Sequence, residues 1–299
     1  MQKNRLWHGW TAVVGVCALW VLPAPARATG GALLPLETET AAPLGSGIAQ
    51  VSIGASYYNN LRFPSFTPAG QFNHQDIVPA PQLGVRIGAG DWAEFQISYE
   101  LIYLDEETTQ HESNWQYGSG DVRVGAKFRL LEEDATWPGL GLRIGTKLPN
   151  ANFDDRLGTD DLDFGAWALV SKDFGAFSAH ANLGLLLLGN PGSTIGNFWD
   201  SGGQDDLFSY AVGTVSRPLG QARTGSYALR VMGEFVGQTG SRFDNDRHVV
   251  RLGVQVGRGS GLLYLGPSLG LVTASENIGV SGGFLYTFDL AATVRALRR

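Results

Sequence analysis

The sequence contains a single cysteine, Cys17, which lies in a leader that we expect to be removed. A mature chain without cysteine has no disulfide and no thiolate ligand, so hydrogen bonds and apolar burial must stabilise it. Charged residues are also scarce, at 17% of the chain, against about 25% in ordinary globular proteins. The five histidines are scattered along the chain, and no glycine loop has a phosphate-binding spacing. We therefore predict neither a cofactor nor a metal site.

Positive charge is in the minority. The formal net charge is −6, and the first 28 residues carry three basic residues and no acidic one, so their removal changes it from −6 to −9. An acidic chain disfavours nucleic acid as a partner, because the phosphates need a basic surface.

Long apolar runs are missing as well. Trp10–Leu22 is the apolar core of the leader, and it is shorter than the ~20 residues that a membrane-spanning helix needs. It follows a basic start and ends before small residues, which predicts a secretory signal peptide over residues 1–28. An uncleaved membrane anchor is the alternative. Cys17 lies inside the apolar run rather than at its end, which argues against a lipoprotein.

Glycine, in contrast, is abundant, with 41 among 299 residues. Glycine in strands suits the tight bends of a sheet that closes on itself. Period-two alternation of apolar and polar residues recurs in about twelve segments of ~10 residues. These segments are 47–58, 80–89, 92–104, 119–131, 137–148, 161–174, 177–189, 206–217, 226–238, 247–257, 261–273 and 277–288. The pattern predicts an all-β chain, an antiparallel transmembrane β-barrel of the outer-membrane type.

The connections between these segments alternate between long polar stretches and short turns, as in barrels with short periplasmic turns and long external loops. The last connection, 274–276, is shorter than this scheme requires. Gly283, Tyr286 and Phe288 form a closing-strand pattern that we interpret as the assembly signal. We expect a periplasmic lead-in over 29–46, the barrel over 47–288 and a C-terminal extension over 289–299. An exported soluble β-protein is the alternative.

The two faces of several segments separate cleanly by residue number. Val122, Val124 and Ala126 alternate with charged residues, so we expect the apolar face to meet lipid and the charged face to line the lumen. The lumen-lining candidates for solute selectivity are Arg123, Lys127, Arg129, Arg143, Lys147, Glu94, Glu100, Asp161 and Asp163. Such a basic stripe flanked by acids can orient charged solutes. Alternatively, the same charges form ion pairs that fill the lumen.

Two further groups carry less chemistry. Ser178, His180 and Asn182 share one strand face and have the residue types of a hydrolase, but alternation directs them inward, away from lipid. We therefore predict that the chain is not an enzyme. Acidic loop residues could attract Ca²⁺, but their spacing matches no dedicated loop, and we interpret them as solvated. These residues are Asp105, Glu106, Glu107, Glu112, Asp154, Asp155, Asp160, Asp205 and Asp206.

Several stretches resemble one known family. They are Gly118–Leu131, Leu142–Pro149, Thr159–Gly165, Ser171–Gly175, His180–Gly184 and the upstream Glu37–Gly45. In these the chain resembles the MetA-pathway of phenol degradation family of outer-membrane proteins, and the resemblance is clearest over residues 115–190. The resemblance implies a transporter-like barrel that is encoded near genes for the degradation of aromatic compounds. It implies no catalytic residue.

The sequence thus predicts an outer-membrane channel in a Gram-negative bacterium. We expect passive uptake of small solutes, hydrophobic or aromatic ones among them. A structural or binding barrel with a filled lumen is the alternative, and a lipid-modifying barrel enzyme is a weaker one. The expected partners are outer-membrane lipids, lipopolysaccharide, the barrel-assembly machinery and a small solute whose identity the sequence leaves open.

Overall fold

The computed structural model describes residues 37–61, 72–108, 113–151, 157–158, 161–189, 206–219, 227–240, 246–290 and 292–293. The predicted signal peptide, with Cys17, and the end of the C-terminal extension lie outside the described residues. In the described part of the chain, no helix is long and apolar enough to cross a membrane.

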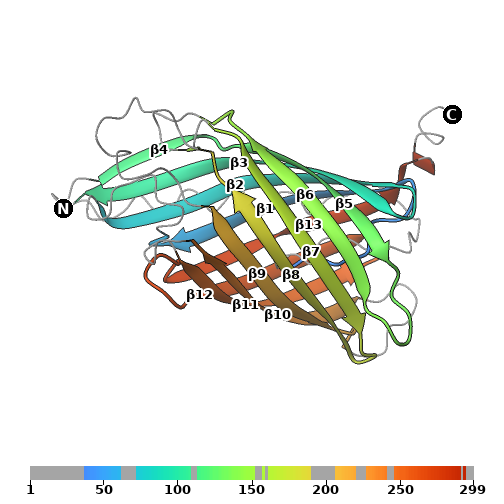
Figure 1. Cartoon of the computed structure of the whole chain (residues 1–299). Helices are drawn as coiled ribbons and strands as arrows, with labels where there is room; N and C mark the ends of the chain where they lie inside the picture. Colours follow the sequence, from blue (N-terminus) through green and yellow to red (C-terminus); the bar gives the residue numbers. More distant parts are fainter. Residues whose placement is uncertain are drawn as a thin grey trace.

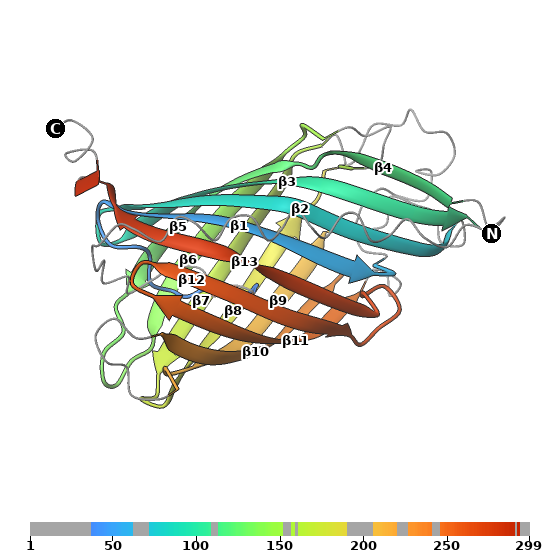
Figure 2. The same cartoon turned by 180° about the vertical axis from the view of Figure 1, so that it is seen from behind.

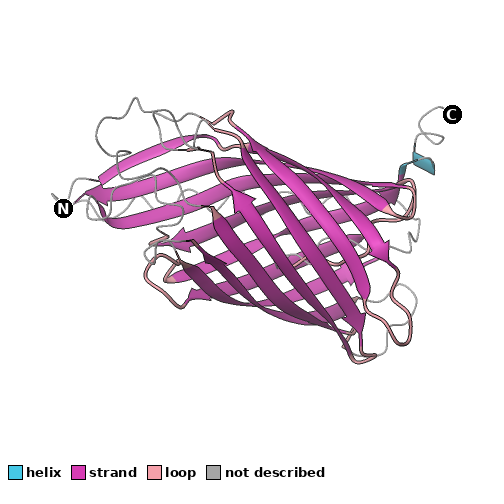
Figure 3. Ribbon diagram, in the orientation of Figure 1, coloured by secondary structure: helices cyan, strands magenta, loops and turns pink. Residues whose placement is uncertain are grey.

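The described chain forms one antiparallel sheet that closes on itself (Figures 1 and 3). The strands are β1 (Ile48–Asn59), β2 (Phe72–Ala89), β3 (Ala93–Thr108), β4 (Ser113–Ser119), β5 (Val122–Leu131), β6 (Gly139–Leu148), β7 (Asp163–Asp173), β8 (Phe177–Leu187), β9 (Leu207–Ser216), β10 (Ala228–Thr239), β11 (Arg247–Arg258), β12 (Gly261–Gly270) and β13 (Ile278–Asp289). β4 and β5 both pair with β3 and take one position in the wall. The predicted all-β barrel of twelve strands is confirmed.

The first and last strands close the barrel. β1 pairs with β13 without interruption from Ile48 opposite Asp289 to Asn59 opposite Ile278. Closure leaves no open edge where β1 and β13 meet, and hydrocarbon would not tolerate one because every backbone N–H and C=O must be bonded there.

Two glycines at this seam make room for a tyrosine. Tyr264 of β12 lies across Gly283 of β13 and Gly54 of β1, which are paired with each other. A Cβ added at Gly283 would lie 2.5 Å from the Tyr264 hydroxyl oxygen, and one added at Gly54 would clash with the same atom. Gly283 therefore has a packing role within the closing strand. Its role as part of an assembly signal, with Tyr286 and Phe288, stays a prediction.

The sheet extends further than the sequence indicated. β2 begins at Phe72 rather than near residue 80. The sequence did not indicate this earlier start because Pro79 and Pro81 interrupt the alternation of apolar and polar residues. These prolines lie at a register shift in β2, where a strand tolerates residues without an N–H. The stretch 105–118, predicted as a loop, instead contains the end of β3 and all of β4 except Ser119. Together β2, β3 and β4 project beyond one end of the barrel (Figures 1 and 2).

The last connection is also longer than predicted. β12 ends at Gly270 and β13 begins at Ile278, so the connection spans 271–277 rather than 274–276. This restores a longer loop at the end where the alternation scheme requires one.

The separation of strand faces agrees with the alternation. Phe95, Ile97 and Ile144 are exposed on the outside of the barrel. Glu94, which precedes Phe95, and Lys127 are fully buried. The outer wall is an apolar belt suited to lipid, and the charged side chains lie within the barrel.

The lead-in differs most from expectation. We expected the segment before β1 to lie in the periplasm, but the described part, Glu37–Gly45, lies inside the barrel and contacts inward side chains of β3, β7, β8 and β10. Alternation of strands carries no information on where a preceding non-strand segment goes. We call Glu37–Gly45 the lead-in below.

Accessibility to reagents on whole cells tests the orientation. A cysteine replacing Glu107, near the tip of the β3–β4 hairpin, should react with a membrane-impermeant thiol reagent on intact cells. A cysteine replacing Gly259, in the β11–β12 turn, should react only after permeabilisation. Reaction at Gly259 but not at Glu107 on intact cells would reverse the orientation.

Candidate lumen site

The barrel holds the lead-in by its peptide groups. The Asn182 side chain accepts the Glu39 N–H at 2.7 Å and donates to the Glu39 carbonyl oxygen at 2.9 Å. The Ala41 N–H donates to Ser171 Oγ, and the Leu44 N–H donates to Glu94 Oε2, both at 2.8 Å. Three wall strands thus supply side-chain partners to a segment that precedes the first strand. Such bonds satisfy peptide groups that would otherwise be buried without partners.

Glycines of the wall also fit the lead-in. A Cβ on Gly141 of β6 would lie 2.9 Å from the Ala41 carbonyl oxygen and 3.2 Å from Ala41 Cα. A Cβ on Gly88 of β2 would clash with the carbonyl oxygens of Leu44 and Gly45. At these two points the backbone of the lead-in approaches the wall closely.

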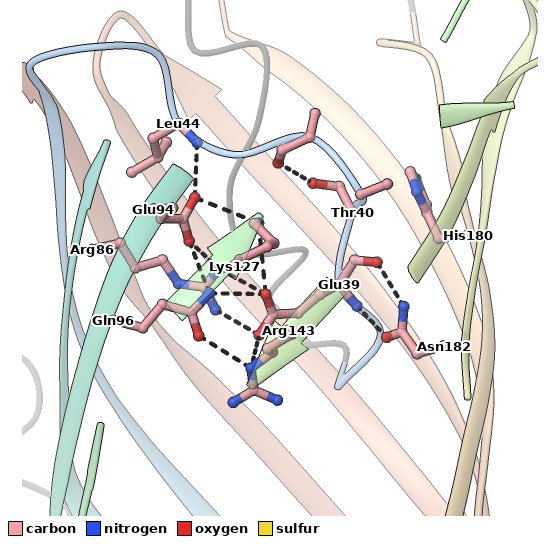
Figure 4. Close-up of polar contacts among 12 residues, drawn as sticks. Glu39, Thr40, Leu44, Arg86, Glu94, Gln96, Lys127, Arg143, His180 and Asn182 are labelled. Atoms are coloured by element: carbon pink, nitrogen blue, oxygen red, sulfur yellow. Dashed lines mark hydrogen bonds and ion pairs between the residues drawn. The ribbon is translucent and has the colours of Figure 1, made fainter. Parts of the chain in front are cut away.

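Glu39, near the start of the lead-in, inserts its carboxylate into a group of cations, shown in Figure 4. We call this group the Glu39 cluster; it comprises Glu39, Arg86, Glu94, Gln96, Lys127 and Arg143. The Glu39 carboxylate lies 3.3 Å from Arg86 Nη2, 3.3 Å from Arg143 Nε and 3.6 Å from Lys127 Nζ.

The wall contributes the other carboxylate of the cluster. Glu94 is fully buried and pairs with Arg86 at 3.3 Å and with Lys127 at 3.4 Å. Gln96 Nε2 donates to both carboxylates, at 3.0 Å to Glu39 and 2.9 Å to Glu94. The amide thus bridges the lead-in and the wall.

A second group holds the start of the lead-in. This Glu234 cluster comprises Glu37, Thr38, Glu234, Arg247, Arg251, Ser268 and Glu276. Glu234 accepts the N–H groups of Glu37 and Thr38 at 2.8 Å each and pairs with Arg251 at 2.7 Å. Arg247 pairs with Glu276 at 3.1 Å and with Glu37 at 3.2 Å.

The arginines decide the charge state of Glu37, which lies outside the membrane-spanning strands. Burial alone would raise the pKa of its carboxyl, but Arg247 and Arg251 outweigh burial and lower the pKa to about 2. Glu37 is therefore ionised at neutral pH, and its attraction to the arginines holds the start of the lead-in in place.

The remaining predicted lumen residues lie outside the two clusters. Lys147 lies between Asp121 at 3.0 Å and Asp163 at 3.1 Å, and Arg123 pairs with Glu100 at 2.7 Å. Arg129 lies at the end of β5, where it pairs with Glu132 at 3.5 Å. Asp161 precedes β7, and its buried Oδ2 has no hydrogen-bond partner among the described residues.

Of the nine predicted lumen residues, the structure therefore brings Glu94, Lys127 and Arg143 into one cluster with the lead-in. Other members of the two clusters were not proposed from the sequence. Alternation could have found Arg86 and Gln96, which share the inward faces of β2 and β3, and Glu234 and Arg251 on β10 and β11. Glu37 and Glu39 lie in the stretch Glu37–Gly45 that resembles the family, but no pattern in the sequence placed them in the lumen.

The Ser178–His180 pair lies within hydrogen-bond distance but in the lumen. His180 Nε2 is 3.1 Å from Ser178 Oγ, and Nδ1 is 2.8 Å from Ser171 Oγ. The imidazole thus contacts two hydroxyls, one of which accepts a lead-in N–H, rather than a carboxylate that would orient it as a base. Asn182 binds the lead-in. Ser178, His180 and Asn182 lie in the lumen, where Asn182 and the His180 partner Ser171 bond the lead-in.

Of the acidic loop residues, those on the β3 extension are strand residues rather than loop residues. Asp105, Glu106 and Glu107 pair in register with β2 and β4, and Glu106 is fully buried. Asp206 precedes β9, where its Oδ1 accepts the Leu188 N–H at 3.2 Å. The others lie outside the described residues: Glu112, Asp154, Asp155, Asp160 and Asp205.

The fold is similar to those of solved outer-membrane barrels. The COG4313 outer membrane channel from Pseudomonas putida F1 superposes with a TM-score of 0.59 at 12% identity, over 83% of this chain and 97% of that one. The translocator domain of the autotransporter NalP from Neisseria meningitidis gives a TM-score of 0.50 at 13% identity, over 82% and 89%. No family model matches the sequence. No curated protein matches it either.

At such identities the similarity shows the fold, and the resemblance to the MetA-pathway family stays a prediction. The closed barrel and its apolar belt are those of an outer-membrane type of β-barrel, and a Gram-negative source stays a prediction.

Loss of one buried arginine tests the Glu234 cluster. Arg251 is 1% exposed and Glu234 is 5% exposed. An Arg251→Met substitution leaves the Glu234 carboxylate buried without its cation, which should lower the free energy of unfolding by roughly 3–5 kcal/mol. Denaturant unfolding of the refolded barrel in detergent measures it.

Arg217→Met is the matched control, since Arg217 pairs with Asp173 at an exposed position. Its cost should be at most about 1 kcal/mol. Equal losses in the two variants would contradict a stabilising role of the buried cluster.

Proposed function

We propose that the protein is an outer-membrane channel for passive uptake of small solutes, hydrophobic or aromatic ones among them, and that the lead-in closes its lumen at rest. The observation that carries the proposal is that an N-terminal segment, rather than inward strand side chains alone, occupies the lumen and contacts both charge clusters. A segment joined to the wall at one end can leave without opening the barrel.

The contacts that hold the lead-in favour a removable closure. They are hydrogen bonds and ion pairs to wall side chains, at Glu234, Asn182, Ser171 and Glu94. Water or a polar solute can replace such partners, whereas the ladder between β1 and β13 has no replacement in lipid. The energy needed to release the lead-in is therefore smaller than that needed to open the wall.

A structural barrel with a permanently filled lumen is the competing function. Its support is the same pairing of charges, since a lead-in anchored at both clusters could simply stabilise the sheet. The two functions differ in whether the lead-in ever moves under native conditions.

A reversible cross-link between the lead-in and the wall separates them. A Cβ at Gly213 of β9 would lie 3.2 Å from Thr38 Cβ, within a few tenths of an ångström of the roughly 3.5–4.5 Å spanned by disulfides. In the double variant Thr38→Cys, Gly213→Cys, oxidation should abolish single-channel currents in planar bilayers. Reduction should restore them.

The two single-cysteine variants are the controls, and reductant should change neither. Mass spectrometry verifies the disulfide in the oxidised double variant. If neither its oxidised nor its reduced form conducts, the structural barrel is favoured. Equal and large conductance would show that solutes pass beside a docked lead-in.

A further inference from the structure

The Glu39 cluster is cationic, and the lead-in supplies one of its two carboxylates. Arg86, Lys127 and Arg143 face Glu39 and Glu94. When the lead-in leaves, three cations remain opposite the single Glu94 carboxylate. Lys127 is fully buried, and uncompensated buried charge is strongly destabilising. The open barrel therefore needs another anion, or substantial water, at the position of the Glu39 carboxylate.

The cluster is arranged to bind a planar carboxylate. Arg86 donates to both Glu39 oxygens, at 3.3 and 3.4 Å, and Gln96 donates to one of them at 3.0 Å. The distances from the three cations exceed the roughly 2.7–2.9 Å of optimal charge-assisted bonds. Asn182 holds the backbone of Glu39 on the opposite side. A carboxylate free of that tether can approach the cations more closely.

An aromatic surface lies beside the same cations. The Arg143 guanidinium stands over the ring of Trp167 at 4.5 Å from the ring centroid. Trp167 lies against the wall over Gly165 and Gly184, where any Cβ would clash with the ring. Trp167 is partly exposed, while one face of its ring lies on the wall and the other lies under Arg143. A flat apolar group joined to a carboxylate at Arg143 can therefore pack against the edge of this ring.

We propose that the Glu39 cluster is a binding site for small carboxylates that carry a flat apolar ring. The carboxylate takes the place of the Glu39 side chain between Arg86, Lys127 and Arg143, and the ring packs on Trp167. Binding of the solute and docking of the lead-in then exclude each other, so the solute promotes its own passage. This inference rests on the proposed channel function for its role in uptake, but the site itself can be tested by binding alone.

Calorimetric titration of the refolded full barrel in detergent with benzoate tests the site. Glu39→Gln removes the competing carboxylate and keeps the side-chain shape, so benzoate should bind about tenfold more tightly than to the unmodified barrel, as expected when one charged hydrogen-bonding competitor is lost. Adding Arg143→Gln to that variant should abolish the gain. Benzyl alcohol and benzylammonium should not bind measurably, and cyclohexanecarboxylate should bind more weakly than benzoate.

Two further variants guard against a folding artefact. Glu132→Gln changes an exposed turn carboxylate and should leave benzoate affinity at the unmodified value. Gly141→Val pushes on Ala41 and should displace the lead-in, so it should tighten benzoate binding as well. Gly257→Val is its control, since the nearest atom to a Cβ there is 3.7 Å away. Heat-modifiable migration on gels verifies that each variant is a folded barrel.

Benzoate affinities that are equal in the Glu39→Gln and unmodified barrels, or equal binding of benzyl alcohol, would overturn the carboxylate site. Bilayer currents distinguish that failure from failure of the channel. Selective benzoate binding without current in any variant would retain the site and refute uptake. Currents with no preference for benzoate would retain the channel and refute the site.

Discussion

The structure depends on the uninterrupted pairing of β1 with β13. This seam closes the sheet, and closure forces alternate side chains either into lipid or into a narrow lumen. Charged residues of the strands have only the lumen available. Once several cations and acids share that space, their separations and partners determine whether it holds water, a solute or another part of the chain.

The lead-in lies in this space, where its carboxylates complement the charges of the wall. Glu39 meets the cations of β2, β5 and β6, whereas Glu37 meets Arg247 and Arg251 of β11. Between these points the wall supplies Asn182 and Ser171 for its peptide groups. Buried pairs of this kind are weak evidence for stability, since desolvation offsets attraction. Such pairs are better suited to determining where a segment docks, and they leave the free energy needed to release it small.

The sequence predicted the wall much better than its contents. Alternation placed Lys127, Arg143 and Glu94 on the inward face because strand geometry directs every second side chain to one side. It misjudged the start of β2, since Pro79 and Pro81 conceal a strand at a register shift. It placed the lead-in outside the barrel, because the docking of an irregular segment depends on contacts nearly 200 residues apart, such as that between Thr38 and Glu234.

The candidate site shares this limit. Lys127 and Arg143 were found, but their partner Glu39 lies in a stretch that has no period and precedes the first strand. Arg86 was missed for a different reason. Its strand segment was identified, and alternation directs its side chain inward, but it is the only charged residue of that segment.

In the proposed channel the lead-in, and not the side chains of the wall, closes the lumen. The decisive measurement is the single-channel conductance of a barrel that lacks residues 37–45 and that heat-modifiable migration shows to be folded. Long-lived open currents are expected where the full chain is mostly closed. A folded barrel without the lead-in that remains closed would contradict the proposal, because the wall side chains alone would then block the lumen.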